Sequence, residues 1–331
     1  MTVTIGRRQL LAALGGAAAA WPLASRAQQP AMPVVGFLSA FGRHDRSNWV
    51  EAFRRGLQGG GFVDGRNVAI EYRFAENQRE RLPALAADLV GRKVAAIVAT
   101  GGGNVILAAK ASTTTIPIVF TFGGDPVKEG FVASLNRPGA NVTGVTFFNT
   151  VVTGKGLGLL HELLPNAAVI ALMVNPNNRE SSTTLEDAQE AARTLGWQLL
   201  VFNASTPNEI DVAFATLRQH RVDALVVASD PFFSIRRQQI VALVTREAIP
   251  NIGFSREWVA EGGLMSYGND VADVYRRAGL YTARILKGEN AADLPVDRAT
   301  RFEFLINLKA AKTLGLEVPP GLSARADEVI E

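Results

Sequence analysis

A strand–turn–helix–strand pattern that occurs twice is the strongest constraint on how this 331-residue chain can fold. In the first copy, Arg92–Val127, apolar runs predict strands at Val94–Ala99 and Ile116–Phe122, with a Gly-rich turn and a helix between them. The second copy has matching strands within residues 220–229 (HRVDALVVAS) and 249–254 (IPNIGF), and both second strands are entered through Ile-Pro. One supersecondary unit is therefore used twice.

The repeat extends to an earlier strand, Val34–Ser39, whose partner is Val169–Val174. Partners lie roughly 130 residues apart, which is about the size of one domain. Short apolar strands that are each followed by a helix predict parallel sheets with both faces covered. We expect an α/β fold with two Rossmann-like lobes, in which a ligand lies at the carboxyl ends of the strands.

The first 27 residues have the three parts of an export signal. Arg7 and Arg8 precede an apolar run, Leu10–Trp21, and Ser25–Ala27 resembles a cleavage site. The apolar run is shorter than the ~20 residues of a membrane span. The paired arginines resemble a twin-arginine signal, and an ordinary secretory signal is the alternative. We expect residues 1–27 to be removed and the mature protein to be periplasmic.

Charge and cysteine content exclude several classes of function. Three of the 34 basic residues lie in the first 27 residues, so the rest of the chain carries 31 basic and 31 acidic side chains. Such a balance gives no electrostatic basis for binding nucleic acid. The sequence has no cysteine, which excludes disulfides, thiolate metal sites and a lipid-anchored N-terminal Cys.

Two Asp-Pro pairs form the closest internal match. Asp125-Pro126 and Asp230-Pro231 each follow a strand, and Asp before Pro suits the start of a helix. We therefore expect helices after both pairs, the first over Pro126–Leu135. The alternative role for either aspartate is a carboxylate that receives a ligand ammonium.

The turn Gly101–Asn104 follows a strand and opens a helix. It matches neither G-x-G-x-x-G nor a Walker A motif, so a nucleotide is not expected. A helix N-terminus there could offer N–H groups to a ligand carboxylate. The alternative is a tight turn in which Asn104 caps its own helix.

The sequence contains no recognisable catalytic constellation. His44, His161 and His220 lack metal-ligand spacing, and no G-x-S-x-G motif is present. We therefore predict neither an enzyme nor a metal or cofactor site. Aromatic side chains near strand ends could instead stack a flat ligand or pack within their own lobes; they are Phe41, Phe122, Phe232, Phe233, Phe254 and Tyr267.

Several longer stretches carry a family resemblance that covers about Pro33 to Pro319. They include IPIVFTFGGDPV at 116–127, ASLNRPGANVTG at 133–144 and GGLMSYG at 262–268. With these, the chain resembles the periplasmic substrate-binding proteins of ABC transporters, in the subgroup with tryptophan- and tyrosine-binding members. The resemblance implies a type I periplasmic-binding-protein fold with three hinge crossings and a cleft between the lobes. We place lobe 1 at residues 33–147 and 264–296, and lobe 2 at residues 148–263 and 297–331.

The resemblance also implies ligand contacts from the loops after the strands. Matched to this sequence, the expected contacts are Ser39, Phe41, Gly42, Thr100, Gly101, Phe122, Gly124, Asp125, Asn175, Asn178, Ser181, Asp230, Phe254 and Tyr267. The charged loop Arg43–Arg46 leaves the ligand open between an amino acid and another aromatic or carboxylic acid.

The implied function is binding of a small solute and its delivery to an ABC permease in the membrane. A ligand-sensing partner of a membrane receptor would have the same fold and the same cleft. An exported enzyme on a two-lobed scaffold is the third hypothesis, and turnover of a bound solute would support it.

Overall fold

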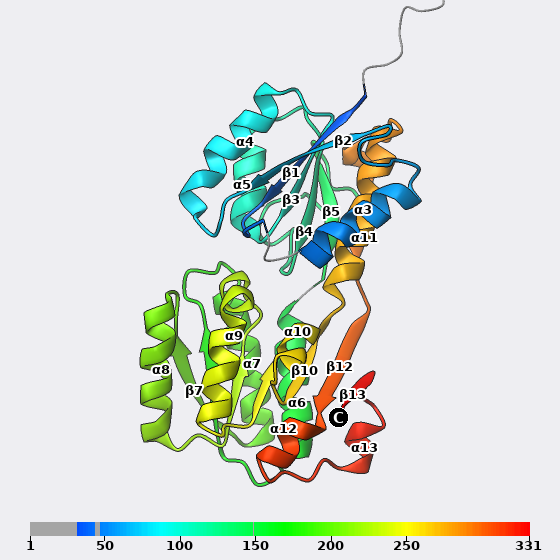
Figure 1. Cartoon of the computed structure of the whole chain (residues 1–331). Helices are drawn as coiled ribbons and strands as arrows, with labels where there is room; N and C mark the ends of the chain where they lie inside the picture. Colours follow the sequence, from blue (N-terminus) through cyan, green and yellow to red (C-terminus); the bar gives the residue numbers. More distant parts are fainter. Residues whose placement is uncertain (1–31, 44–46, 148) are drawn as a thin grey trace, which may run out of the picture. The chain divides into compact units, whose positions relative to one another are not determined.

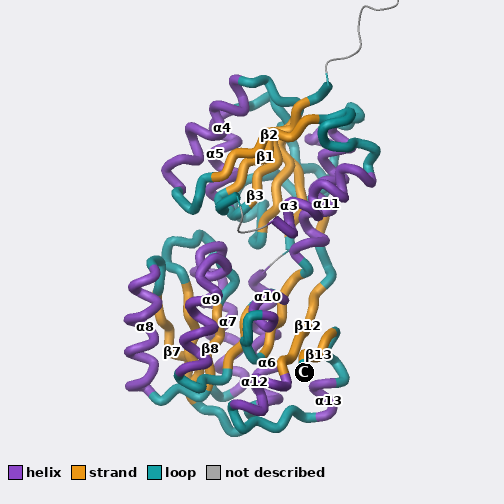
Figure 2. Tube along the Cα trace, in the orientation of Figure 1, coloured by secondary structure: helices purple, strands orange, loops and turns teal. Residues whose placement is uncertain are grey.

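Two sheets organise the computed structural model, which describes residues 32–43, 47–147 and 149–331. The expected signal peptide lies outside the described residues. Val34–Glu331 form one compact unit. Helices cover both faces of each sheet (Figures 1 and 2). The α/β prediction with two lobes of mainly parallel strands is confirmed.

The first sheet has six strands, all parallel to their neighbours. In spatial order they are β11 (Asp297–Arg298), β5 (Val142–Thr146), β4 (Ile118–Phe122), β3 (Ala96–Thr100), β1 (Val34–Ser39) and β2 (Ala69–Phe74). The surrounding helices are α3 (Ser47–Gly59), η1 (Arg79–Arg81), α4 (Leu82–Gly91), α5 (Gly103–Ser112), α11 (Val271–Leu286) and η2 (Ala291–Asp293). Phe37 and Leu38 of β1 are both fully buried, in the core clusters of opposite faces, as expected for a strand covered on both sides.

The second sheet has seven strands, of which only the β10–β12 pair is antiparallel among the described residues. In order they are β13 (Glu328–Ile330), β12 (Phe302–Asn307), β10 (Met265–Asn269), β9 (Asn251–Gly253), β8 (Ala224–Val227), β6 (Val169–Val174) and β7 (Gln198–Asn203). Its helices are α6 (Asn149–Leu163), α7 (Ser181–Leu195), α8 (Pro207–His220), α9 (Pro231–Arg246), α10 (Arg256–Ala260), α12 (Leu308–Thr313) and α13 (Pro320–Ser323).

The sequence repeat appears as a repeated strand order. The order β5-β4-β3-β1-β2 in the first sheet corresponds, strand for strand, to β10-β9-β8-β6-β7 in the second. The chain passes between the two sheets three times: after β5, after β10, and between β11 and β12. Asn269 Nδ2 donates a hydrogen bond to the carbonyl oxygen of Phe147 at 2.8 Å, which ties the first two passages together.

The lobe boundaries differ from those expected at residues 264 and 297. Strand β10 pairs with β9 and β12 in the second sheet, and Asp297–Arg298 pairs with β5 in the first. The chain therefore returns to the first lobe after Asn269 and leaves it again after Arg298. The residues LMSY indicate a strand, but which sheet they join depends on partners that are distant in sequence.

The expected helix over Pro126–Leu135 is absent; residues 126–130 form turns and residues 131–135 have bends and irregular backbone. Asp125 Oδ1 accepts hydrogen bonds from the backbone N–H groups of Val127 and Lys128, at 2.8 and 3.2 Å. This cap closes a single turn, because Gly130 adopts a positive φ of 70°.

Close packing of α11 on α3 brings the returning segment against the first sheet. A Cβ atom on Gly56 would lie 1.8 Å from the carbonyl oxygen of Arg276, and one on Gly279 would lie 2.2 Å from that of Phe53. Only glycine permits the two helix backbones to approach so closely. The contact places Val271 and Tyr275 of α11 near the strand ends of the first sheet.

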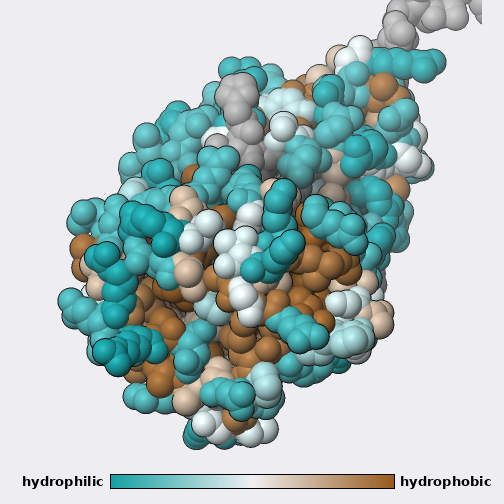
Figure 3. All heavy atoms as spheres, turned by 60° about the horizontal axis from the view of Figure 1, so that its bottom comes forward, coloured by the Kyte–Doolittle hydropathy of each residue, from teal (hydrophilic) through white to brown (hydrophobic). Residues whose placement is uncertain are grey.

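The surface over the second lobe mixes apolar and polar side chains. Figure 3, which brings the bottom of Figure 1 forward, shows apolar groups in brown between hydrophilic ones in teal. Large apolar side chains with high exposure in this lobe include Val201 on the edge strand β7 and Val212 on α8. Interspersed apolar surface of this kind is normal for a globular protein.

Candidate ligand-binding site

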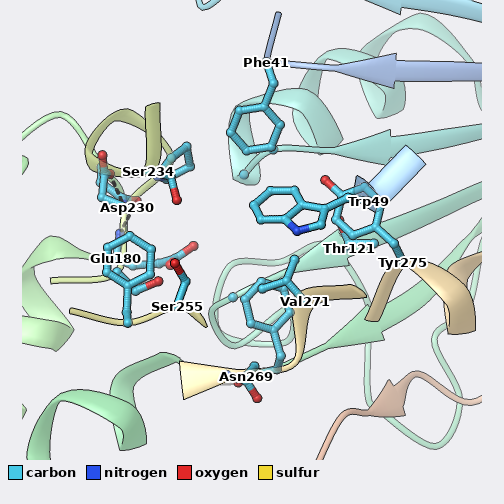
Figure 4. A pocket seen from close by; sticks show the side chains of 18 residues that line it. Phe41, Trp49, Thr121, Glu180, Asp230, Ser234, Ser255, Asn269, Val271 and Tyr275 are labelled. Carbon is cyan, nitrogen blue, oxygen red and sulfur yellow. Dashed lines mark hydrogen bonds between the residues drawn. The ribbon is translucent and has the colours of Figure 1, made fainter. Parts of the chain in front are cut away.

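A pocket lies where loops from the two sheets meet, and Figure 4 shows it from close by. One side is lined by residues that follow β1, β3, β4 and β5 or lie on α3 and α11. The other side is lined by residues that follow β6, β8 and β9. Ligands of parallel α/β sheets bind at this carboxyl edge of the strands.

Three aromatic rings from three different elements form one wall. The ring centroids of Phe41 and Trp49 are 5.7 Å apart, and those of Trp49 and Tyr275 are 5.4 Å apart. Phe41 follows β1, Trp49 lies on α3 and Tyr275 on α11, so the glycine contact between the two helices sets this wall. In Figure 4 these rings lie across the pocket from Asp230 and Glu180. The wall suits a flat apolar group.

Asp230 anchors the opposite side and is almost completely buried. Its Oδ1 accepts hydrogen bonds from the backbone N–H groups of Phe232 and Phe233, at 2.7 and 3.2 Å, which caps α9. Oδ1 also accepts from Asn175 Nδ2 at 3.1 Å, and Oδ2 accepts from Asn178 Nδ2 at 2.8 Å. Burial raises the pKa of Asp230, while these four hydrogen bonds act to lower it.

Glu180 is the second acidic side chain of the pocket. It immediately precedes α7, and its backbone N–H donates to Asn178 Oδ1 at 3.2 Å. Burial raises the pKa of Glu180 to about 8, with smaller contributions from the nearby carboxylates of Asp230 and Glu129. Among the residues that line this pocket in the described part of the chain, none is Arg, Lys or His.

The turn after β3 supplies backbone to the same pocket. Gly101 and Gly102 have φ of +97° and +107°, and a Cβ on Gly101 would lie 2.9 Å from that of Ala40. Gly102 is the N-cap of α5 and has no side chain with which to cap it. Asn104 lies inside the helix, so the alternative role that the sequence allowed, a cap by the Asn104 side chain, is not observed. The first turn of α5 leaves N–H groups that suit a carboxylate.

Polar contacts join the two sides around the pocket. Arg79 Nη1 donates to the carbonyl oxygen of Asn177 at 2.9 Å, and Lys128 Nζ donates to Thr183 Oγ1 at 3.2 Å. Arg79 and Lys128 belong to the first lobe, whereas Asn177 and Thr183 belong to the second. Such contacts stabilise the arrangement in which the lobes touch.

Residues 35–330 match the family of ABC transporter substrate binding proteins. The chain belongs to this family. A curated relative, the tyrosine-binding protein of Clostridioides difficile strain R20291, is 28% identical over 268 residues, covering 81% of this chain and 76% of the relative.

Solved structures share the fold of this substrate-binding protein. A conserved domain protein of Vibrio cholerae and an ABC domain of Streptococcus pneumonia in complex with L-Trp each have a TM-score of 0.83 and 24% identity. A ligand-free, open substrate binding protein of Clostridium difficile has a TM-score of 0.68 and 26% identity. Each comparison covers 90% of this chain and 99% of the other.

Five of the expected contacts of the substrate-binding protein line the pocket: Phe41, Gly101, Asn178, Asp230 and Phe254. These residues follow β1, β3, β6, β8 and β9. They lie together because the carboxyl ends of parallel strands meet at one edge of each sheet.

Four other expected residues do not line the pocket but form hydrogen bonds to the lining residues or to segments next to them. The Ser39 hydroxyl accepts from the N–H of Phe41 at 3.2 Å, and Thr100 Oγ1 donates to the carbonyl oxygen of Leu38 at 3.5 Å. Asn175 holds Asp230, and the Ser181 hydroxyl donates to the carbonyl oxygen of Asn175.

The remaining expected residues lie elsewhere or only beside the pocket. Phe122 packs edge-on against Phe131 within the first lobe, with centroids 5.0 Å apart. The Gly124 carbonyl accepts from Thr146 Oγ1 at 2.7 Å, and Asp125 caps its turn. Tyr267 stacks on Phe302 at 5.7 Å. Gly42 is buried in the loop after β1, next to the lining residue Phe41.

Sequence reasoning missed much of the lining. The missed residues with side chains lie mostly on helices or chain passages: Trp49, Thr121, Phe147, Glu180, Ser229, Pro231, Ser234, Ser255, Asn269, Val271 and Tyr275. Glu180 lies in the loop after β6, between the expected contacts Asn178 and Ser181. Nothing local in the sequence indicates that α11 returns to this edge.

The described residues contain no cluster of His, Cys, Asp and Glu that could hold a metal ion. They also contain no helix of the length and apolar character needed to cross a bilayer.

Proposed function

We propose that this substrate-binding protein binds one small solute, an amino acid or an aromatic carboxylic acid, in the pocket between its lobes. It then delivers the solute to the permease of an ABC importer from outside the cytoplasm. The observation that supports this proposal most directly is that one pocket combines an aromatic wall, two acidic side chains and a helix N-terminus without a side-chain cap.

Each part of such a ligand has a partner of suitable chemistry. A flat apolar body fits against Trp49 and Tyr275. A carboxylate fits the N–H groups at the start of α5, where the helix dipole favours negative charge. The tyrosine-binding relative supports an aromatic amino acid among the solutes of this class.

Closure around the solute explains how one small ligand could signal its presence to a permease. Moving a two-state balance from 1:99 to 99:1 requires about 5.5 kcal/mol of preference for the closed form. A ligand with micromolar affinity supplies about 8 kcal/mol of binding free energy. The contacts of Arg79 and Lys128 across the pocket would be made only in the closed form.

A thermal-shift screen of the purified protein tests the proposal. Amino acids and aromatic acids are compared at the same millimolar concentration. A ligand present at 100 times its Kd should stabilise the protein by about 2.7 kcal/mol, a shift of several degrees. Absence of a shift with every compound would contradict the proposal, and so would conversion of a bound compound into a product.

A further inference from the structure

Two carboxyl groups share the pocket, but the protein uses them differently. Asp230 already accepts four hydrogen bonds from backbone and amide groups. Oδ1 accepts three of these bonds and Oδ2 accepts one, so only about one acceptor position, on Oδ2, is left for a ligand. The carboxyl group of Glu180 accepts no hydrogen bond and forms no ion pair within the described residues.

The position of Glu180 is fixed from both sides of the pocket. Its backbone is held by Asn178, and Asn178 is held by Asp230. On the other lobe, a Cβ atom built on Gly124 would lie 3.0 Å from Glu180 Cγ, so the side chain passes close over this glycine. These contacts hold the backbone and Cγ of Glu180 beside the pocket that its side chain lines.

The charged groups around Glu180 leave its charge uncompensated. Asp230 and Glu129 are both acidic and both disfavour ionisation of Glu180. Arg179 is the nearest cation in sequence, but its Nε binds Glu129 Oε2 at 2.6 Å. Lys128 donates to Thr183 on α7. Among the described residues no cation is paired with Glu180, so we take the ligand as the source of a cation there.

We propose that Glu180 is the counter-charge for a protonated amine of the ligand, and that this contact makes the protein specific for amine-bearing solutes with an aromatic body. The inference rests on the proposed function and narrows its ligand class. An aromatic acid that lacks an amine would bring a negative charge into a pocket whose described lining has two carboxyl groups and no Arg, Lys or His. An aromatic amino acid matches both ends of the pocket.

Calorimetric titration of two ligands into three proteins tests this assignment. The ligands are L-tyrosine and 3-(4-hydroxyphenyl)propionate, which lacks the amine. The proteins are the wild type, Glu180→Gln and the control Glu186→Gln, which changes an exposed glutamate on the same helix. A charge-assisted hydrogen bond in a buried site predicts that the wild type prefers tyrosine by about 10-fold to 100-fold.

The preference for L-tyrosine over the amine-free acid should fall at least about tenfold in Glu180→Gln and stay unchanged in Glu186→Gln. Glu180→Asp, which keeps the charge on a shorter side chain, should recover part of it. Equal weakening of both ligands by Glu180→Gln would show a structural role and overturn the inference. A wild-type preference for the amine-free acid would also overturn it. If neither compound nor any other amino acid binds, the proposed function itself fails, and this inference fails with it.

Discussion

The guanidinium of Arg179 lies 2.6 Å from the carboxylate of Glu129, and this ion pair joins the two lobes beside the ligand pocket. Arg179 belongs to the loop after β6, whereas Glu129 belongs to the turn after β4. The pair therefore links the strand ends of the two sheets. We propose that it acts as a latch on a closed form of the protein.

Glu129→Gln should weaken ligand binding without much effect on the free energy of unfolding. Because the ion pair is partly exposed, its loss should cost up to about 1 kcal/mol of binding free energy, or about fivefold in affinity. Most of this loss should appear as a faster dissociation rate of the ligand. Stopped-flow dissociation rates would measure this. Glu190→Gln is the control, because Glu190 pairs with Arg193 within α7. Equal effects of the two substitutions would contradict a latch.

The raised pKa of Glu180, about 8, predicts how stability depends on pH. Glutamate in an unfolded chain has a pKa of about 4.3. Between these values the folded protein keeps a proton that the unfolded chain has lost, so the free energy of unfolding falls as the pH rises. One group contributes at most about 1.4 kcal/mol per pH unit.

Urea unfolding of the ligand-free protein and of Glu180→Gln at several pH values from 5.5 to 8 would measure this term. The glutamine variant should become the more stable of the two as the pH rises. A constant difference between them would contradict the assigned pKa.

Asp230→Ala should destabilise the ligand-free protein by about 2–4 kcal/mol, because it removes the cap of α9 and leaves the buried amide of Asn175 and the partly buried amide of Asn178 without this acceptor. Asp125→Ala is the matched control from the other Asp-Pro pair. Since Asp125 caps only one turn, its loss should cost about 1 kcal/mol or less. Urea midpoints with unchanged m-values would measure both. A similar loss in the two variants would show that the Asn contacts to Asp230 add nothing.

Gly56→Ala should separate α3 from α11, because the new Cβ would overlap the carbonyl oxygen of Arg276. We expect a loss of about 1–3 kcal/mol in stability and a further loss of ligand affinity as Tyr275 moves away from Trp49. Gly59→Ala on the same helix meets only a side-chain atom of Leu280, at 3.6 Å, and should be neutral or slightly stabilising. If Gly56→Ala is destabilised but keeps its ligand affinity, the contact between α3 and α11 does not set the aromatic wall of the pocket.

Removing the Trp49 side chain tests the aromatic wall itself. Trp49→Ala should lower the affinity for an aromatic solute by at least about tenfold, since large aromatic contacts dominate binding energy. Trp197 and Trp258 lie buried in the core clusters of the second lobe, so a ligand-dependent change of fluorescence in the wild type should disappear in Trp49→Ala. A change that persists would place the solute elsewhere.

The sequence predicted the repeated core because apolar strands and their order of appearance are local signals. It did not predict which sheet receives β10, although the repeat contained the answer. Met265–Asn269 is the counterpart of β5, since both stand at the same place in the two strand orders. Following the repeat through its fifth strand would have placed it in the second lobe.

The missed pocket residues show where local reasoning ends. Loops after strands were found because every parallel strand brings its carboxyl end to one edge. Tyr275 reaches that edge only through the contact of α11 with α3, which joins residues more than 200 positions apart. Glu180 lies between the expected contacts Asn178 and Ser181, but its role depends on Asp230 and Glu129, which approach it only in the folded chain.

A crystal structure of the protein grown with L-tyrosine would test the central claim most directly. We expect density for one ligand between the lobes, with its ring against Trp49 and Tyr275 and its amine about 3 Å from the carboxylate of Glu180. An empty pocket at saturating ligand, or a ligand bound with its amine turned away from Glu180, would contradict this account.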